Sequence, residues 1–436
     1  MNRRLILLLL AAAMLLSGCA LSTVDKMYSL PKRSDQYNDL QSAIDGAMTD
    51  LEYCAPLSGE NQQTVQMADL DGDGVEEYLL FARGSSEDPL KILIFDMEDG
   101  SYRLCRTIES KGSSFEQVEY VDMDDQPGLE LVVGRQVSDQ ILRSLSVYTF
   151  SSGDAEQLMS VNYARFVTSD LDRDGRTELV VIAPGDTETD HALASCYSCQ
   201  DGMIVRSAEA SLSETVDHIK RIRVGKLHGG VSAVYVASAV EESAIITDVF
   251  ALKDGRFTNV SFSNESGTSV QTLRNYYVYA DDIDGDGVLE LPSLITMATQ
   301  GRSGEPNYLI RWYAMKLSGE EVDKMYTFHN FDGGWYLQLD STLAQRVTVE
   351  QDGNTYSFSL WDEELRGSEK LVTVFAFTGS TRDEEAVEEG RFVLHKADGV
   401  VYAAKLETAA ISCGITQENM INSFSLIHQD WKTGET

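Results

Sequence analysis

A nine-residue acidic pattern constrains this chain more than any other feature of its sequence. In its first copy, residues 69–77 read D-L-D-G-D-G-V-E-E, so acids occupy positions 1, 3, 5 and 9 and glycine occupies position 6. Carboxylates on alternate residues suit a hard cation such as Ca²⁺, which takes about six to eight oxygen ligands in irregular geometry. Glycine allows the sharp bend that such a loop needs. The pattern therefore predicts a calcium-binding loop.

The pattern occurs in full three times and in a degenerate form once. We take the acids, and the residue at position 7 through its backbone carbonyl, as candidate metal ligands. In the three complete copies these residues are Asp69, Asp71, Asp73, Val75, Glu77, Asp170, Asp172, Asp174, Arg176, Glu178, Asp282, Asp284, Asp286, Val288 and Glu290. The degenerate copy offers Asp122, Asp124 and Glu130.

An EF-hand is the first alternative, and it does not fit. Its loop requires a bidentate Glu at position 12 and a helix on each side, whereas position 12 is Leu80, Val181 or Ser293. Most of the loops are followed by a β-like apolar run, as at 78–81 and 179–182. We expect turns between strands, each held by calcium. At ~1 mM Ca²⁺ and a Kd of ~10⁻⁴ to 10⁻³ M, a site adds roughly 0.4–1.4 kcal/mol of stability.

The spacing of the loops predicts a repeat architecture. The first acids stand at 69, 122, 170 and 282, and the last interval (282 − 170 = 112) is about twice the others, which points to a further copy near 226. There Lys226 and His228 replace the acids, so we expect strands without metal. Each unit holds about four strand-like runs, and a period near 50 residues with four strands is typical of a propeller blade. We predict a mainly β fold with about five four-stranded blades over 61–330.

The D-x-D-x-D-G-x-x-E loops, most of them followed by an apolar strand, resemble the FG-GAP/VCBS-type repeats of the integrin-α-like β-propeller superfamily. The resemblance covers roughly 270 of the 436 residues. The order of N-terminal signal, short helix, a Leu57-Ser58-Gly59 lead-in and acidic loop is also similar to clostridial VCBS-repeat lipoproteins. The resemblance implies calcium in the loops on one face and partner binding on another; it does not imply catalysis.

The N-terminus is typical of a bacterial lipoprotein precursor. Arg3 and Arg4 precede an apolar run over 5–16, which is too short to span a bilayer and is followed by L-S-G-C ending at Cys19. We expect a signal peptide over 1–18, lipid attachment to Cys19, and a tether over 19–33. The protein would then be anchored on the extracytoplasmic face of the cell membrane. An ordinary signal peptide is the alternative. A helix and lead-in are expected over 34–60.

Charge bounds the class of partner. The chain has 70 acidic and 35 basic residues, and such a surface repels nucleic acid and anionic lipid headgroups. It suits cations and basic partners, although much of the charge is equally explained by calcium ligands and solvated loops. We expect no nucleic-acid partner.

After residue 330 the period stops, and we expect a small α+β domain over 331–436 with several antiparallel strands and a helix over 416–431. A degenerate sixth blade is the alternative.

The sequence carries no motif of a common catalytic site: there is no H-E-x-x-H, G-x-S-x-G or P-loop. Cys196 and Cys199 form a lone C-x-x-C, and residues three apart in a strand point to opposite faces, so we expect buried thiols and not a metal site. We predict a non-enzymatic envelope module that binds a protein or glycan. The alternatives are a glycan-binding or glycan-processing protein, in which the aromatic residues at 275–279 and 312–313 stack sugars, and a propeller scaffold whose C-terminal domain carries the partner site.

Overall fold

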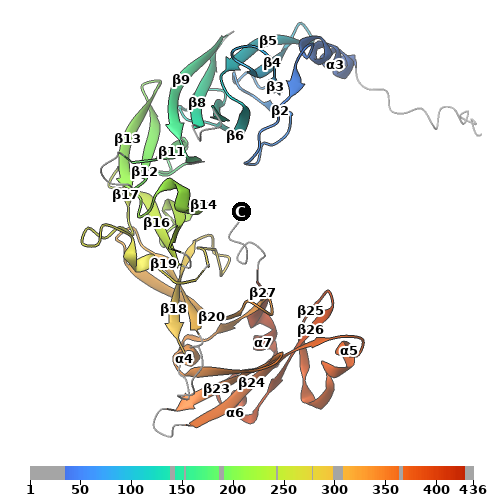
Figure 1. The fold of residues 1–436 in the computed structure, drawn as a ribbon, viewed down its shortest axis with the longest axis vertical. Helices are drawn as coiled ribbons and strands as arrows, with labels where there is room; N and C mark the ends of the chain where they lie inside the picture. Colours follow the sequence, from blue (N-terminus) through green and yellow to red (C-terminus); the bar gives the residue numbers. More distant parts are fainter. Residues whose placement is uncertain are drawn as a thin grey trace, which may run out of the picture. The chain divides into compact units, whose positions relative to one another are not determined.

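The computed structural model describes residues 35–137, 143–151, 154–185, 191–241, 244–276, 278–297, 308–362 and 367–427. The fold is mainly β, as the sequence predicts, and its strands form antiparallel sheets of four or five strands (Figure 1). The chain divides into two compact units. One comprises 1–55, 63–69 and 74–111, and the other comprises 56–62, 70–73 and 112–436. The predicted signal peptide, Cys19 and the tether lie outside the described residues.

The first unit is one sheet with a helix against it. Helix α3 (Asp35–Ala47) buries Leu40 and Ile44 against Leu80, Leu93 and Phe95 of the sheet. The strands are β1 (Glu52–Tyr53), β2 (Val65–Ala68), β3 (Glu77–Arg83), β4 (Leu90–Glu98) and β5 (Ser101–Ser110). Their order is β1-β3-β4-β5, and β2 pairs with the same edge of β3 as β1 does. Strand β1 pairs with residues 82–83 of β3, and β2 pairs with residues 77–80. The helix and the four strands expected in this first repeat are confirmed.

The second unit begins with four further sheets, one for each remaining repeat. One sheet comprises β6 (Ser114–Val121), β7 (Glu130–Gln136), β8 (Arg143–Ser151) and β9 (Asp154–Tyr163). The next comprises β10 (Arg165–Ser169), β11 (Glu178–Ala183), β12 (Leu193–Gln200) and β13 (Met203–Ser211). A third sheet comprises β14 (Ile219–Lys226), β15 (Ser232–Val240), β16 (Ala244–Lys253) and β17 (Arg256–Asn259). The fourth comprises β18 (Glu290–Thr296), β19 (Tyr308–Met315), β20 (Glu321–Asn330), β21 (Trp335–Leu339) and β27 (Phe424–Leu426). Short 3₁₀ turns lie at Val216–His218 and Val270–Thr272.

Successive sheets of the second unit pack face to face. Adjacent residues of a strand point to opposite faces, and Val180 and Val181 of β11 accordingly enter two different cores. Val181 packs with Val132 of β7, whereas Val180 packs with Val234 of β15. Because both faces are covered, the inner strands are apolar at nearly every position, as in the buried run over 179–182.

A β-bulge recurs between the third and fourth strands of a repeat. It lies between β4 and β5, β8 and β9, β12 and β13, and β19 and β20. The register skips one residue of the fourth strand each time, which makes that residue the bulged one. The four bulged residues are Cys105, Leu158, Ser207 and Lys324.

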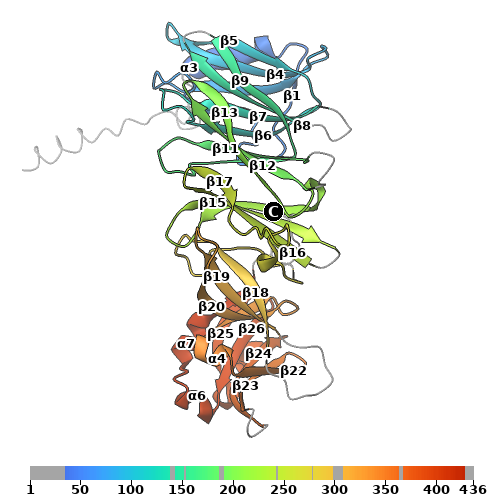
Figure 2. The same cartoon turned by 90° about the vertical axis from the view of Figure 1, so that its left-hand side faces the viewer.

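The C-terminal region forms a sheet of order β22-β23-β24-β26-β25 with short helices (Figure 2). Its elements are α4 (Ser341–Ala344), β22 (Val347–Asp352), β23 (Thr355–Asp362), β24 (Gly367–Thr378), α5 (Arg382–Glu385), a 3₁₀ turn (Glu388–Gly390), β25 (Phe392–Ala397), β26 (Val400–Leu406), α6 (Thr408–Ser412) and α7 (Gln417–Ser423).

The helix expected over 416–431 is wrong at residues 424–427, and residues 428–431 lie outside the described part of the chain. The chain instead forms strand β27, which pairs with β21 in the sheet of the fifth repeat. Phe424 stacks on Trp335 with ring centroids 5.5 Å apart, so tertiary packing overrides the helical spacing of the apolar residues. Strand β21 itself pairs with β20, although it follows residue 330.

Candidate metal centres

Each acidic loop closes a hairpin between the first and second strands of a repeat, and the register is the same in all four. The residue before position 1 pairs with the Glu at position 9, which opens the second strand. These pairs are Ala68 with Glu77, Val121 with Glu130, Ser169 with Glu178, and Asp281 with Glu290. The identical register means that the acids of each loop return over the same buried Glu.

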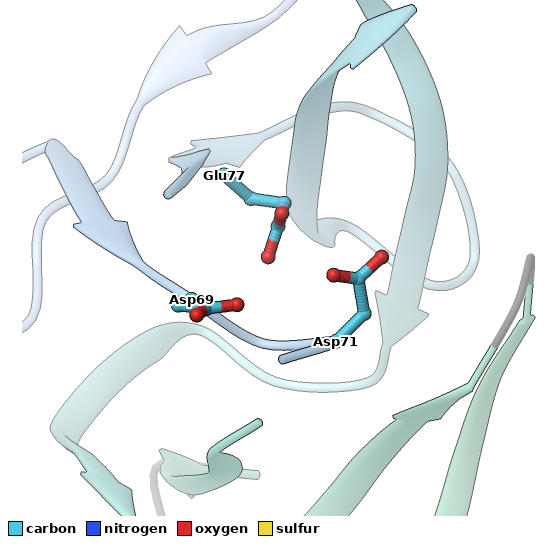
Figure 3. A group of neighbouring side chains, drawn as sticks. All are labelled: Asp69, Asp71 and Glu77. Atoms are coloured by element: carbon cyan, nitrogen blue, oxygen red, sulfur yellow. The ribbon is translucent and has the colours of Figure 1, made fainter. Parts of the chain in front are cut away.

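The loops bring three carboxylates together in each copy. One oxygen from each acid at positions 1, 3 and 9 lies within 4.8 Å of the others. In the first loop the carboxylates of Asp69, Asp71 and Glu77 point toward one shared space (Figure 3). The other trios are Asp122, Asp124 and Glu130; Asp170, Asp172 and Glu178; and Asp282, Asp284 and Glu290. Each of these clusters is able to hold a metal ion.

Backbone N–H groups orient the carboxylates of the loops. In the third loop, Leu171 N donates to Glu178 Oε2 (2.7 Å), Asp174 N to Asp172 Oδ1 (3.1 Å) and Gly175 N to Asp170 Oδ2 (3.2 Å). The glycine is at position 6 and has φ +95°, a conformation that a side chain resists. The motif thus orients its own ligands.

The same bonds recur in the other loops of the second unit. Met123 N donates to Glu130 Oε2 (2.8 Å) in the second loop, and Ile283 N donates to Glu290 Oε2 (3.2 Å) in the fifth. Gly287 N, again at position 6, donates to Asp282 Oδ2 (2.9 Å). The second loop therefore assembles its acids as the complete copies do, although its glycine stands at position 7.

The electrostatics of these clusters fit a divalent cation. The position-9 glutamates are buried, with Glu178 5% exposed and Glu290 fully buried. Burial, reinforced by the neighbouring aspartates, raises the pKa of both to about 7. Within the described part of the chain, Asp282 Oδ1 and Glu290 Oε1 are buried without a hydrogen-bond partner. Crowded carboxylates with unsatisfied oxygens are the donor set that Ca²⁺ prefers.

The acids at position 5 lie outside the trios. Asp174 is held by the guanidinium of Arg176, which lowers the pKa of that carboxyl, and Asp286 forms an ion pair with Lys324, which does the same. At position 7, Arg176 N and Val288 N donate to the position-5 carboxylates at 2.8 and 2.9 Å. In the first loop, Asp73 N donates to Asp71 Oδ1 (3.3 Å), and the side chain of Val75 is exposed.

The fourth hairpin has strands without an acid trio. Lys226 pairs with Ser232 across a shorter loop, and the loop bonds to the fifth repeat. Leu289 N donates to Lys226 O (3.0 Å), and His228 N donates to Met315 O (2.9 Å).

Loops of neighbouring repeats are joined by backbone bonds. Thr177 N, at position 8 of the third loop, donates to Asp122 O, at position 1 of the second (2.7 Å). The bond from Leu289 to Lys226 has the same geometry between the fourth and fifth repeats. The second loop is thus bonded to the third, and the fourth to the fifth.

Three of the aromatic residues and the two cysteines considered as candidates are buried inside the fold. Tyr279, Trp312 and Tyr313 are buried, and Trp312 Nε1 donates to Thr327 Oγ1 (2.8 Å), so these rings are not available to stack a sugar. Cys196 and Cys199 are free, buried, and in different cores, as their spacing predicts. Within the described residues, no helix has both the length and the apolar composition needed to cross a bilayer.

The sequence analysis missed Lys324. It stands 34 residues beyond the end of the fifth loop, and its approach depends on the bulge in β20, for which the sequence carries no local signal.

No protein-family model and no curated protein matches the chain. Among solved structures it is similar to the rhamnogalacturonan lyases YesW (11% identity, TM-score 0.30, covering 73% of this chain and 83% of that one) and YesX (13%, 0.29, 75% and 68%). A putative 6-phosphogluconolactonase from Bacteroides uniformis gives 13% identity and a TM-score of 0.28, covering 72% and 86%. At these TM-scores the similarities carry no conclusion about fold or activity.

Proposed function

We propose that the chain is a calcium-stabilised β-propeller that acts as a non-enzymatic binding module, held on the extracytoplasmic face of the cell membrane by a lipid on Cys19. The observation that carries the proposal is the recurrence of one hairpin: four loops share a register and a trio of convergent carboxylates. In this proposal the repeat sheets are propeller blades, and Ca²⁺ neutralises the acids where neighbouring loops meet.

The binding role is supported by what the repeats provide. The strands are committed to packing, and the acidic residues that the sheets bring together are explained as ion ligands. A protein or glycan with cationic groups suits the net charge of −35. We do not extend the proposal to glycan processing, because the aromatic residues 279, 312 and 313 are buried.

Equilibrium dialysis against calcium, with a protein that comprises residues 20–436, tests the proposal. We expect three or four bound ions, and Asp71→Ala combined with Asp172→Ala should remove two of them. Affinity capture from envelope extracts in calcium and in chelator then identifies the partner. The proposal would be contradicted if the protein bound no calcium. It would also be contradicted if the purified protein had a hydrolytic activity that one point mutation abolished.

A further inference from the structure

The fifth acidic loop contains a positive charge that comes from another strand of its sheet. Lys324 Nζ forms an ion pair with Asp286, lies 3.4 Å from Asp284 Oδ2 and lies 3.8 Å from Glu290 Oε1. Asp284 and Glu290 belong to the carboxylate trio of this loop. The ammonium group is therefore beside the oxygens that an entering cation would use.

The bulge in β20 accounts for this placement. Trp312 pairs with Met325 and Tyr313 pairs with Asp323, so Lys324 is the extra residue between them. A bulge re-aims the side chain of its extra residue, and the side chain of Lys324 is only 17% exposed. The equivalent bulges of other repeats carry Cys105, Leu158 and Ser207, none of which supplies a positive charge.

The lysine donates to Asp284 and Asp286 but leaves two other buried oxygens of the loop without a hydrogen bond. Glu290 is fully buried, and its Oε1 accepts no hydrogen bond within the described residues, since Lys324 lies beyond hydrogen-bond distance. Asp282 Oδ1 is in the same condition. Two buried carboxylate oxygens without a hydrogen-bond partner, in a loop whose acids converge, indicate that the loop is built for a cation that bonds them directly.

The third loop provides the contrast. Its one ion pair in the described structure joins Arg176 to Asp174, outside the trio of Asp170, Asp172 and Glu178. No Lys or Arg of the described chain forms an ion pair with that trio, although the Arg176 guanidinium interacts electrostatically with Asp172 and Glu178, so an entering ion displaces no ion pair there.

Building on the proposed function, we propose that Lys324 is an internal competitor of Ca²⁺ at the fifth loop. It holds the loop together when calcium is scarce, and it must leave Asp284 and Glu290 when the ion binds. The fifth loop therefore binds calcium more weakly than the third and releases it first as calcium falls. This makes the third and fifth loops respond to different calcium concentrations.

Calorimetric calcium titration of Lys324→Met tests the competition. Two to three lost ion pairs of ordinary surface strength correspond to about tenfold tighter binding at one site. Lys316→Met is the matched control, because it removes a lysine–carboxylate pair with Glu320 in the same repeat, outside the acidic loop; it should leave every site unchanged. The gain should also vanish when Asp284→Asn is added.

A second measurement separates the two proposals. In EDTA, Lys324→Met should melt at a lower temperature than Lys316→Met, and calcium should restore it. Calcium binding by every variant with no tightening in Lys324→Met would overturn the competition while leaving the proposed function intact. No calcium binding by any variant would overturn both.

Discussion

The substitution Asp172→Asn, at position 3 of the third loop, should lower the stability of the protein in calcium but not in EDTA. Asparagine keeps the shape of the side chain and retains an oxygen that accepts the 3.1 Å bond from Asp174 N, so the turn is preserved. The substitution removes a charge and a ligand oxygen from the trio. Asp172 is also one of the charges that, after burial, raise the pKa of Glu178 to about 7. Without an ion, its removal relieves repulsion.

The magnitude follows from linkage. A site with a Kd of ~10⁻⁴ M contributes about 1.4 kcal/mol at ~1 mM Ca²⁺, and a Kd of ~10⁻³ M gives about 0.4 kcal/mol. With an unfolding entropy of about 2 cal/mol/K per residue over roughly 400 residues, losing one site lowers Tm by about 0.5–2 °C. In EDTA the variant should equal or exceed the wild type.

Differential scanning calorimetry in calcium and in EDTA measures the change. Asp254→Asn is the matched control, because Asp254 lies in the turn between β16 and β17 at φ +52°, which asparagine tolerates, and outside every trio. It should have the same effect in both buffers. If Asp172→Asn also shifts Tm equally in calcium and in EDTA, the reasoning that assigns its carboxylate to an ion is refuted.

Three further perturbations follow from the same structure. In EDTA, the free energy of unfolding should fall from pH 5 to pH 8, because Glu178 and Glu290 have a folded-state pKa of about 7, above the unfolded value of about 4.3, and favour folding only while protonated. Urea denaturation at several pH values should show a flatter profile in calcium. An equal slope in both buffers would argue against ion binding. Gly72→Ala should cost about 1–3 kcal/mol, because its Cβ would lie 2.3 Å from Pro127 Cβ, whereas Gly74→Ala, which is also at positive φ with nothing within 4 Å, should cost less; equal urea midpoints would show that these loops do not touch. Deleting residues 331–436 should cause aggregation in size-exclusion chromatography, because it removes β21 and β27 and the buried Trp335 from the fifth sheet; a monodisperse product would contradict this.

The acidic loops could be predicted from sequence because every determinant is local. Nine residues supply the carboxylates, the glycine bend and the first residue of the next strand, and one register then places Asp170 over Glu178. The fourth repeat, whose described residues bring no acid trio together, could be located from spacing, because the strands flanking Lys226 keep their apolar pattern.

What the sequence could not supply depends on contacts between distant segments. Lys324 reaches the fifth loop only because β20 is bulged, and a bulge is a property of strand pairing. The apolar residues after Ser423 have helical spacing, yet Phe424 pairs with Leu337 of β21 and stacks on Trp335. In both cases a partner far along the chain decides the outcome.

Anomalous diffraction from crystals grown in calcium tests the central claim most directly. The account predicts peaks about 2.3–2.6 Å from carboxylate oxygens of the trios that contain Asp71, Asp172 and Asp284, with the weakest of the three beside Lys324 and none in the loop of His228. Carboxylates that turn away from one another, with no anomalous peak between them, would contradict it.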